Sequence, residues 1–333
     1  MTEENIETGT EEVFHQRIDI VTLNNAMIDI RNEIGKVIVG QHKMVDLLLI
    51  GLLSDGHILI EGVPGVAKTL TAKLLAKIIN TGFSRIQFTP DLMPGDVLGT
   101  SVFNPRDGVF EFKRGPIFSN IILIDEINRA PAKTQSALFE VMEEKQVTID
   151  GHTYPMDFPF LVLATQNPIE QEGTYRLPEA QLDRFLFKIL VDYPTIDEEV
   201  NILINQQSIS QNTLLNNVQK IFTTGQIHEY KNIINGVIIE PQLIRFIAEI
   251  VNATRNNSSL FLGASPRASL AILKSSKANA AIKGRDFVIP EDIIEMALPV
   301  MRHRIILTPE KEMEGISADE LVMGIINNIE VPR

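Results

Sequence analysis

The chain has 333 residues, of which 44% are hydrophobic and 22% are charged, and its formal net charge at pH 7 is −13. This length is long for one core and fits two domains, and the composition is that of an ordinary globular protein. The absence of cysteine excludes disulfides and thiolate chemistry. The acidic balance disfavours sequence-independent nucleic-acid binding, because that binding needs clustered Lys and Arg side chains.

No apolar run approaches the length of about 20 residues that a transmembrane helix needs, and the acidic N-terminus is unlike a secretory signal. We therefore expect a cytoplasmic protein without a membrane span. Residues 1–17 are rich in Glu and Thr and are predicted to form a flexible leader. Residues 18–195 alternate between amphipathic helices and short apolar strands, which predicts an α/β core.

Two segments interrupt this core. Residues 90–115 carry many Gly and Pro residues and one side of a hairpin, and residues 147–155 form a second hairpin with an Asp-Gly turn. Beyond a predicted boundary near residue 195 the strand signals mostly disappear. Residues 196–333 are therefore expected to form a smaller, all-α domain.

A phosphate-binding loop is predicted between the first strand of the core, at 57–60, and the helix that follows it. Unpaired backbone N–H groups and the helix dipole favour an anion there. Lys68 adds a positive charge for the β- and γ-phosphates, and the Thr69 hydroxyl is a ligand for Mg²⁺. The loop and the first helical residues are Gly62, Val63, Pro64, Gly65, Val66, Ala67, Lys68, Thr69 and Leu70.

Ala67 departs from the usual GxxxxGK[ST] pattern, which has Gly before the Lys. An alanine is acceptable there if its φ is negative, and it is strained if its φ is positive. The structural alternative for the whole stretch is a tight turn before a helix, without any ligand. The Lys-Thr pair and the flanking strand and helix favour phosphate binding.

The apolar strand that ends near residue 124 delivers two carboxylates, Asp125 and Glu126, at its carboxyl end, where parallel sheets bind ligands. Adjacent strand residues point to opposite sides, so the two should have different roles. We expect Asp125 to hold Mg²⁺ and Glu126 to act as the general base toward the water that attacks the γ-phosphate. The alternative is a surface acidic pair.

Three further polar residues are candidates for the same chemistry. Asn167 ends the next strand and is expected to orient the attacking water, although Asn-Pro is also a common turn pair. Arg184 is a candidate arginine finger toward a neighbouring subunit, or a local partner of Asp183; Arg129 is a weaker candidate for such a contact. Arg267 follows Ser-Pro in the first turn of a helix, where a cation opposes the dipole unless a phosphate binds it.

Together these motifs resemble those of AAA+ ATPases and, more closely, of the MoxR family. The matching stretches are residues 62–69, 125–131, 164–168, 177–185 and 263–267. In that resemblance they correspond to Walker A, Walker B, sensor 1, the arginine finger and sensor 2. MoxR-like proteins usually carry Ala at the position of Ala67.

The resemblance implies a parallel five-stranded sheet flanked by helices, with an all-α lid domain, ATP and Mg²⁺ as cofactors, and a homo-hexameric ring. It places the adenine base near Val39, Gly40 and Gln41. It implies that both inserts face the pore or the substrate side of the ring. It also implies a protein client and a partner that contains a von Willebrand factor A domain.

The leading reading of the sequence is a ring-shaped ATPase that remodels a protein client in the manner of a chaperone. A nucleic-acid motor, such as a helicase or a restriction translocase, is the runner-up, because related AAA+ proteins share the insert. The net charge disfavours it. A third alternative is a scaffold that binds ATP and barely hydrolyses it, and Glu126 argues against that.

Overall fold

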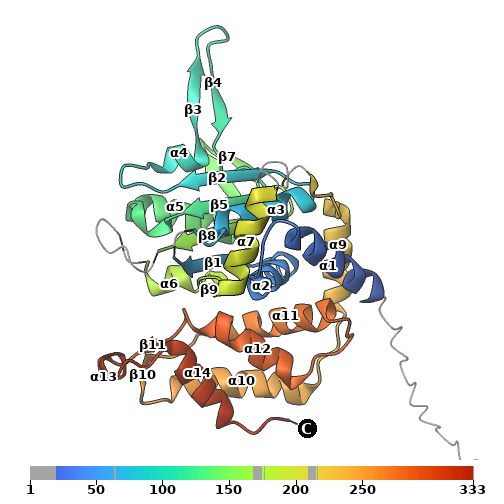
Figure 1. Ribbon diagram of the computed structural model, residues 1–333. Coiled ribbons are helices and arrows are strands. Elements are labelled where there is room, and N and C mark those ends of the chain that lie inside the picture. Colours follow the sequence, from blue (N-terminus) through green and yellow to red (C-terminus); the bar gives the residue numbers. More distant parts are fainter. Residues whose placement is uncertain are drawn as a thin grey trace, which may run out of the picture.

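A computed structural model describes residues 20–63, 65–167, 175, 177–208, 215 and 217–332 (Figure 1). The predicted leader, residues 1–17, and Pro64 of the predicted phosphate loop lie outside the described residues. Within the described part of the chain, no helix is both long and apolar enough to cross a membrane.

One parallel sheet of five strands forms the centre of the first half of the chain. The strands are β1 (His57–Gly62), β2 (Phe83–Gln87), β5 (Ile121–Asp125), β8 (Leu161–Gln166) and β9 (Phe185–Val191). Their order across the sheet is β2-β5-β8-β1-β9, and every neighbouring pair is parallel. All five strands therefore end at one edge, the carboxyl edge, and begin at the other, the amino edge. The predicted five-stranded parallel sheet is confirmed.

Helices cover both faces of this sheet, because alternate strand residues point to opposite sides. In β1, Ile58 and Ile60 pack on one face with side chains of α1 (Ile20–Gly35), α2 (His42–Leu53) and α3 (Lys68–Ile78). Leu59 packs on the other face with side chains of α5 (Ala132–Glu144). The unbroken apolar runs of the strands follow from this burial on two sides.

A hairpin lies within each of the two segments predicted to interrupt the core. The first consists of α4 (Pro94–Leu98) and a hairpin of β3 (Gly99–Asn104) and β4 (Val109–Arg114), which projects from the body at the top of Figure 1. The second is a hairpin of β6 (Gln146–Ile149) and β7 (His152–Pro155). Its turn residues, Asp150 and Gly151, have φ values of 51° and 77°. This is the left-handed backbone that an Asp-Gly turn favours.

A short helix, α6 (Glu179–Leu182), precedes β9, and helices dominate the described chain after β9, which we call the helical half. The described helices there are α7 (Ile196–Ser208), α9 (Thr224–Asn235), α10 (Pro241–Arg255), α11 (Pro266–Ile282), α12 (Pro290–Met301), α13 (Pro309–Met313) and α14 (Ala318–Asn327). A short antiparallel ladder of β10 (Leu260–Leu262) and β11 (Ile306–Leu307) joins two of the loops. The sequence analysis did not predict α9, α13 or this ladder.

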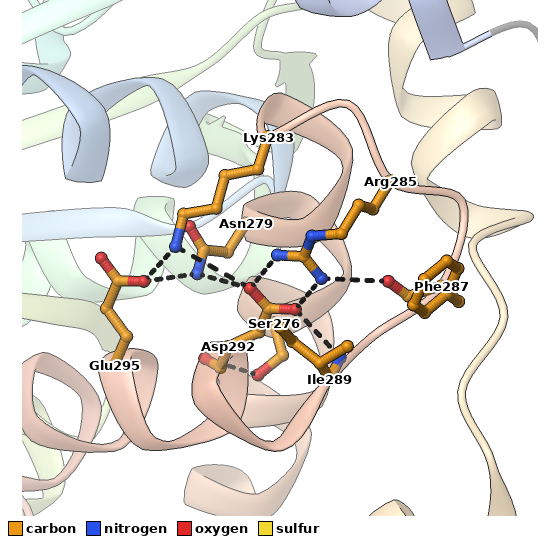
Figure 2. Close-up of polar contacts among 8 residues, drawn as sticks. All are labelled: Ser276, Asn279, Lys283, Arg285, Phe287, Ile289, Asp292 and Glu295. Carbon is orange, nitrogen blue, oxygen red and sulfur yellow. Dashed lines mark hydrogen bonds and ion pairs between the residues drawn. The ribbon is translucent and has the colours of Figure 1, made fainter.

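A buried polar network fixes the start of α12 against the end of α11 (Figure 2). The Asp292 side chain is fully buried and accepts two hydrogen bonds of 2.6 Å from the Arg285 guanidinium. It also accepts from the Ile289 backbone N–H at 3.0 Å, which caps the helix. Asn279 donates to both Asp292 and Glu295, and Lys283 pairs with Glu295. The network therefore joins two helices through one buried carboxylate.

The turn after α12 attaches the helical half to β9. The Arg302 side chain donates to the Lys188 carbonyl at 3.2 Å, and the His303 imidazole donates to the Phe185 carbonyl at 3.0 Å. The Arg304 guanidinium is buried and pairs with Asp183 at 2.7 Å. In addition, α11 packs against α1 and α2. The helical half is thus held to both an edge strand and the helical face of the sheet.

Candidate active site

The predicted phosphate loop connects the carboxyl end of β1 to the first turn of α3. At Gly62 a Cβ atom would lie 2.5 Å from the Val191 carbonyl of β9, so only glycine fits. Gly65 has a φ of +91°, a conformation that side chains rarely adopt. Val66 is buried in the core, and Val63 and Leu70 pack against that core. Gly65 is exposed, and the described part of the loop leads directly into the N-terminus of α3 at the carboxyl edge.

Ala67 has a left-handed backbone, with φ 59° and ψ 19°. An alanine is unstrained at this position only if its φ is negative, and the φ of Ala67 is positive. The left-handed conformation costs roughly 1–2 kcal/mol. The Ala67 carbonyl accepts hydrogen bonds from the Thr71 backbone N–H at 2.9 Å and the Thr71 hydroxyl at 3.0 Å. These bonds hold the strained residue at the start of the helix. Such strain is commonly found where a loop binds a ligand.

The Lys68 side chain bends back over the loop, and its ammonium group donates to the Gly62 carbonyl at 2.6 Å. Burial lowers the pKa of Lys68, while the carboxylates of Asp125, Glu126 and Glu61 oppose that effect. Lys68 and the two predicted catalytic carboxylates therefore share one electrostatic environment.

Asp125 is the last residue of β5, and its carboxylate is buried. It pairs with the Arg85 guanidinium at 2.6 Å and accepts from the Thr165 hydroxyl at 3.2 Å. Carboxylate and hydroxyl oxygens are ligands that suit Mg²⁺, which usually binds through one or two protein groups, water and phosphates. The donor set of Asp125 and Thr69 fits that ion.

Glu126 follows β5 directly and has a φ of 59°. Its backbone N–H donates to the Thr165 hydroxyl at 3.1 Å, which turns the chain away from the strand. The Glu126 side chain accepts from the Gln87 amide at 2.7 Å and pairs with Arg129 at 3.1 Å. Arg129 is thus tied to Glu126 at the carboxyl edge of its own chain.

Three residues at this site were missed by the sequence analysis: Arg85, Gln87 and Thr165. Arg85 and Gln87 lie on β2 and Thr165 on β8, the strands on either side of β5. The sequence did contain a signal for two of them. Arg85 and Gln87 are two residues apart, so both point to one side of β2, a strand that ends beside Asp125. Asn167 directly follows β8 at the same edge.

The segment predicted to meet the adenine base precedes α2. Gly40 and Gln41 both have left-handed backbones, with φ values of 69° and 56°, and Val39 precedes them. The Gln41 amide donates to the Asp192 carbonyl at 3.4 Å, and both residues line a cavity with Tyr193 and Arg302. Because β9 runs beside β1 and Gly62 pairs with Val191, this cavity lies next to the phosphate loop.

Arg184 and Arg267 lie at the amino edge of the sheet, opposite the carboxyl edge that carries the phosphate loop. Arg184 directly precedes β9, whose first residue pairs with His57, the first residue of β1. The six-residue strand β1 separates this point from the phosphate loop by roughly 17 Å. Arg267 lines the same cavity as Arg184. The structure therefore does not bring either arginine to the phosphate loop of its own chain.

One carboxylate, that of Glu143 at the end of α5, holds both arginines. Its Oε1 atom is 2.8 Å from Arg267 Nη2, and its Oε2 atom is 3.3 Å from Arg184 Nε. Arg184 also donates to the Phe139 carbonyl. The predicted N-cap of α11 is present, since the Ser265 hydroxyl accepts from the Arg267 N–H at 3.2 Å. Core and helical half thus each supply one arginine to a single cluster.

Comparison with known proteins agrees with this geometry. Residues 57–187 match the "ATPase family associated with various cellular activities (AAA)", and residues 252–325 match the AAA lid domain. Chaperone MoxR1 of Mycobacterium tuberculosis is 43% identical over 95% of this chain and 84% of its own length. YeaC of Bacillus subtilis is 46% identical over 90% of this chain and 92% of its own.

A crystal structure of a protein from Cytophaga hutchinsonii superposes with a TM-score of 0.87 and 47% sequence identity, covering 94% of this chain and 97% of that one. The fold and the phosphate loop define the class of AAA+ proteins. Within that class, the chain belongs to the MoxR family of AAA+ ATPases.

Proposed function

We propose that this protein hydrolyses ATP to ADP and phosphate in a Mg²⁺-dependent reaction and uses the energy to remodel a protein client. The observation that supports this most directly is the convergence of the phosphate loop, Asp125, Glu126 and Asn167 at the carboxyl edge of one sheet. A nucleotide-gated scaffold would not require a carboxylate at the position of Glu126.

Each residue has a distinct role in this proposal. The N–H groups of the loop and of the first turn of α3 bind the phosphates, and Lys68 moves from the Gly62 carbonyl to the β- and γ-phosphates. Thr69 and Asp125 would hold Mg²⁺, which would neutralise charge on the phosphates. Glu126 accepts the proton of the attacking water, and Asn167 orients that water. Val39, Gly40 and Gln41 contact the adenine.

Arg184 and Arg267 act on the nucleotide of a neighbouring subunit. Their place at the amino edge supports this assignment, since they are remote from the phosphate loop of their own chain. Arg184 is the main arginine finger, because it lies at the amino edge, whereas Arg129 is paired with Glu126 at the carboxyl edge of its own chain. The active site is therefore completed by assembly, and a homo-hexameric ring is the assembly that the family resemblance implies.

The client is a protein rather than a nucleic acid. The name of the relative Chaperone MoxR1 supports this choice, and the net charge of −13 opposes a nucleic-acid motor. A cytoplasmic location and a partner with a von Willebrand factor A domain belong to the same proposal, as does the division into a core up to residue 195 and a lid beyond it. Hydrolysis stimulated by DNA, and weakened steeply by salt, would favour the motor instead.

The test is the variant Glu126→Gln. We expect ATP binding to be retained and phosphate release to fall by at least about 100-fold, because the amide cannot accept the proton of the water. Phosphate release and filter-bound ATP measure the two steps separately. Glu140→Gln, an exposed position on α5, is the matched control. Unchanged hydrolysis in Glu126→Gln would refute the role of Glu126.

A further inference from the structure

Helix α7 lies on the surface with its apolar side chains exposed. None of the described side chains of α7 is buried. Ile196 is 82% exposed and Leu203 is 60% exposed, and Val200 and Ile204 are exposed as well. With about 100° of rotation per residue, these four side chains fall on one side of the helix. We call this set, Ile196, Val200, Leu203 and Ile204, the α7 stripe.

The α7 stripe faces away from the body of its own chain. Glu198 lies on the opposite side of the helix and approaches the backbone at Gly40, where a Cβ atom would meet its carboxylate. The same carboxylate accepts from the Thr195 N–H at 2.8 Å, which fixes the first turn. The side of α7 that carries Glu198 and Ile202 therefore faces the body, and the more exposed side chains of the α7 stripe face outward.

This arrangement predicts a partner for the stripe. A helix of 13 residues is marginal in water without tertiary packing, and α7 has none of its described side chains in the core. Burial of exposed apolar side chains against a partner is also favourable, because it removes apolar surface from water. A protein surface that covers the stripe would supply both contributions.

The face of α11 that carries Arg267 has the chemistry to be that surface. Arg267, Leu270 and Lys274 share one side of α11 and line the open cavity at the amino edge. Leu270 is 56% exposed, so it presents an apolar side chain between two cations. The α7 stripe has the complementary pattern, because Asp197 and Glu199 flank its apolar residues on either side.

We propose that the α7 stripe of one subunit packs against the Arg267–Leu270–Lys274 face of α11 in a second copy of this chain. The inference rests on the proposed function, in which Arg267 reaches the neighbour's nucleotide at the carboxyl edge. Helix α7 begins just after β9 reaches that edge, so a neighbouring α11 that delivers Arg267 there lies beside it. The contact is heterologous, with different patches on each subunit, and such a contact forms a ring when the rotation between successive subunits closes.

Disulfide trapping tests the contact directly, because the natural chain contains no cysteine. Leu203→Cys and Leu270→Cys are made in separate chains, both in the Glu126→Gln background, mixed with ATP and oxidised. We expect a cross-linked dimer in the mixture and little in either variant alone. A chain with both substitutions should give a ladder of larger products. Leu203→Cys mixed with Ile244→Cys, an exposed apolar position on α10, is the control and should give no product.

A second measurement is independent of cysteine placement. Replacing Leu203 and Ile204 together by Ser should raise the protein concentration needed for assembly by at least about tenfold, while Ile244→Ser should not. Light scattering measures assembly, and circular dichroism checks that the subunit is folded. Normal assembly of the double variant, or assembly without the mixed cross-link, would overturn the inference and leave the proposed ATPase in place. Failure of the wild-type chain to bind ATP would instead overturn the proposed function itself.

Discussion

At the scale of single residues, Glu143 links the two arginines that we assign to the neighbouring active site. Its side chain is 36% exposed, and ion pairs at that exposure contribute about 1 kcal/mol or less. Both guanidinium groups can therefore exchange this carboxylate for phosphate oxygens at little cost. Until then, Glu143 keeps Arg184 and Arg267 side by side.

Glu143→Gln should reduce kcat for ATP hydrolysis by roughly fivefold to tenfold, because the arginines are no longer held in one orientation. The KM for ATP should change by less than about twofold, since in the proposed site the phosphate loop and residues 39–41 supply the main binding contacts to the nucleotide. Steady-state kinetics separate the two constants. Glu144→Gln, the exposed neighbour on the same helix, serves as the control. A rise in KM at constant kcat would contradict this role for Glu143.

His57 makes the stability of the amino edge dependent on pH. Its buried imidazole accepts from the Val162 N–H and donates to the Met142 carbonyl, each at 3.0 Å. Burial lowers the pKa of His57 from 6.5 to about 4. The neutral form is favoured by folding, so stability is complete above pH 6.5 and is lost as the pH falls from 6.5 toward 4.

The free energy of unfolding should therefore fall by about 2 kcal/mol between pH 7 and pH 5 through His57 alone. Urea denaturation at both pH values measures it. His57→Asn should be less stable at pH 7 and should lose less stability on acidification. Burial also lowers the pKa of His303, so His303 adds a loss of the same sign. Equal pH sensitivity in wild type and His57→Asn would rule out this origin.

The positions of the phosphate loop before α3 and of the acidic pair at the end of β5 were predictable from the sequence, because both are local patterns. The φ of Ala67 was not predictable, since it depends on how β1 and α3 meet. Neither was the bond from Gln87 to Glu126, which joins side chains on two strands. The convergence of Arg184 and Arg267 on Glu143 requires three segments to meet in space, and no sequence spacing encodes it.

At the scale of elements, the network of Figure 2 shows how α12 is fixed to α11. Asp292 is fully buried and satisfied by Arg285 and by the N-terminus of its own helix. Removing one partner of such a pair leaves an uncompensated buried charge.

Asp292→Ala should lower the free energy of unfolding by roughly 3–5 kcal/mol, because the Arg285 guanidinium loses its buried counter-charge. Glu291→Gln changes an exposed carboxylate in the same helical turn and should have an effect below about 0.5 kcal/mol. Chemical denaturation monitored by circular dichroism compares the two. A similar loss in both variants would show that the network is not the cause.

Elements with strong local signals were predicted well, and those with weak signals were not. The hairpin at 147–155 follows from its Asp-Gly turn. Helix α9 was missed because only Ile227, Tyr230 and Ile234 mark its buried side among polar neighbours. The β10–β11 ladder pairs segments more than forty residues apart, and each strand is too short for a periodic pattern.

At the scale of the whole molecule, the residues predicted for one active site occupy opposite edges of the sheet. Mixing two inactive variants tests this division. The Arg184→Ala chain lacks the arginine finger but keeps an intact phosphate loop and Glu126. The Glu126→Gln chain lacks the general base but keeps an intact Arg184. In random mixed rings, about one junction in four joins an intact loop to an intact arginine, so we expect activity up to about a quarter of wild type.

The control for this complementation mixes Glu126→Gln with a chain that carries both substitutions, and it should remain inactive. Phosphate release is the readout. If Arg184 served its own chain, the first mixture would stay as inactive as its components.

The division of the chain near residue 195 stays a prediction. The buried apolar residues form one cluster that runs continuously from α1 through α12 and α14.

The turn after α12 has a mechanical consequence. Arg302 lines the cavity beside the phosphate loop, and Arg304 lines the cavity that contains the two arginines. Between them, His303 is bonded to β9, and Arg304 is bonded to Asp183, Phe185, Leu186 and Val300. The strand β9 and the turn at residues 302–304 are therefore held together as one rigid unit that connects the two cavities. We therefore expect that a nucleotide entering or leaving beside Arg302 would tilt the surface around Arg304, which in the proposed ring meets the next subunit.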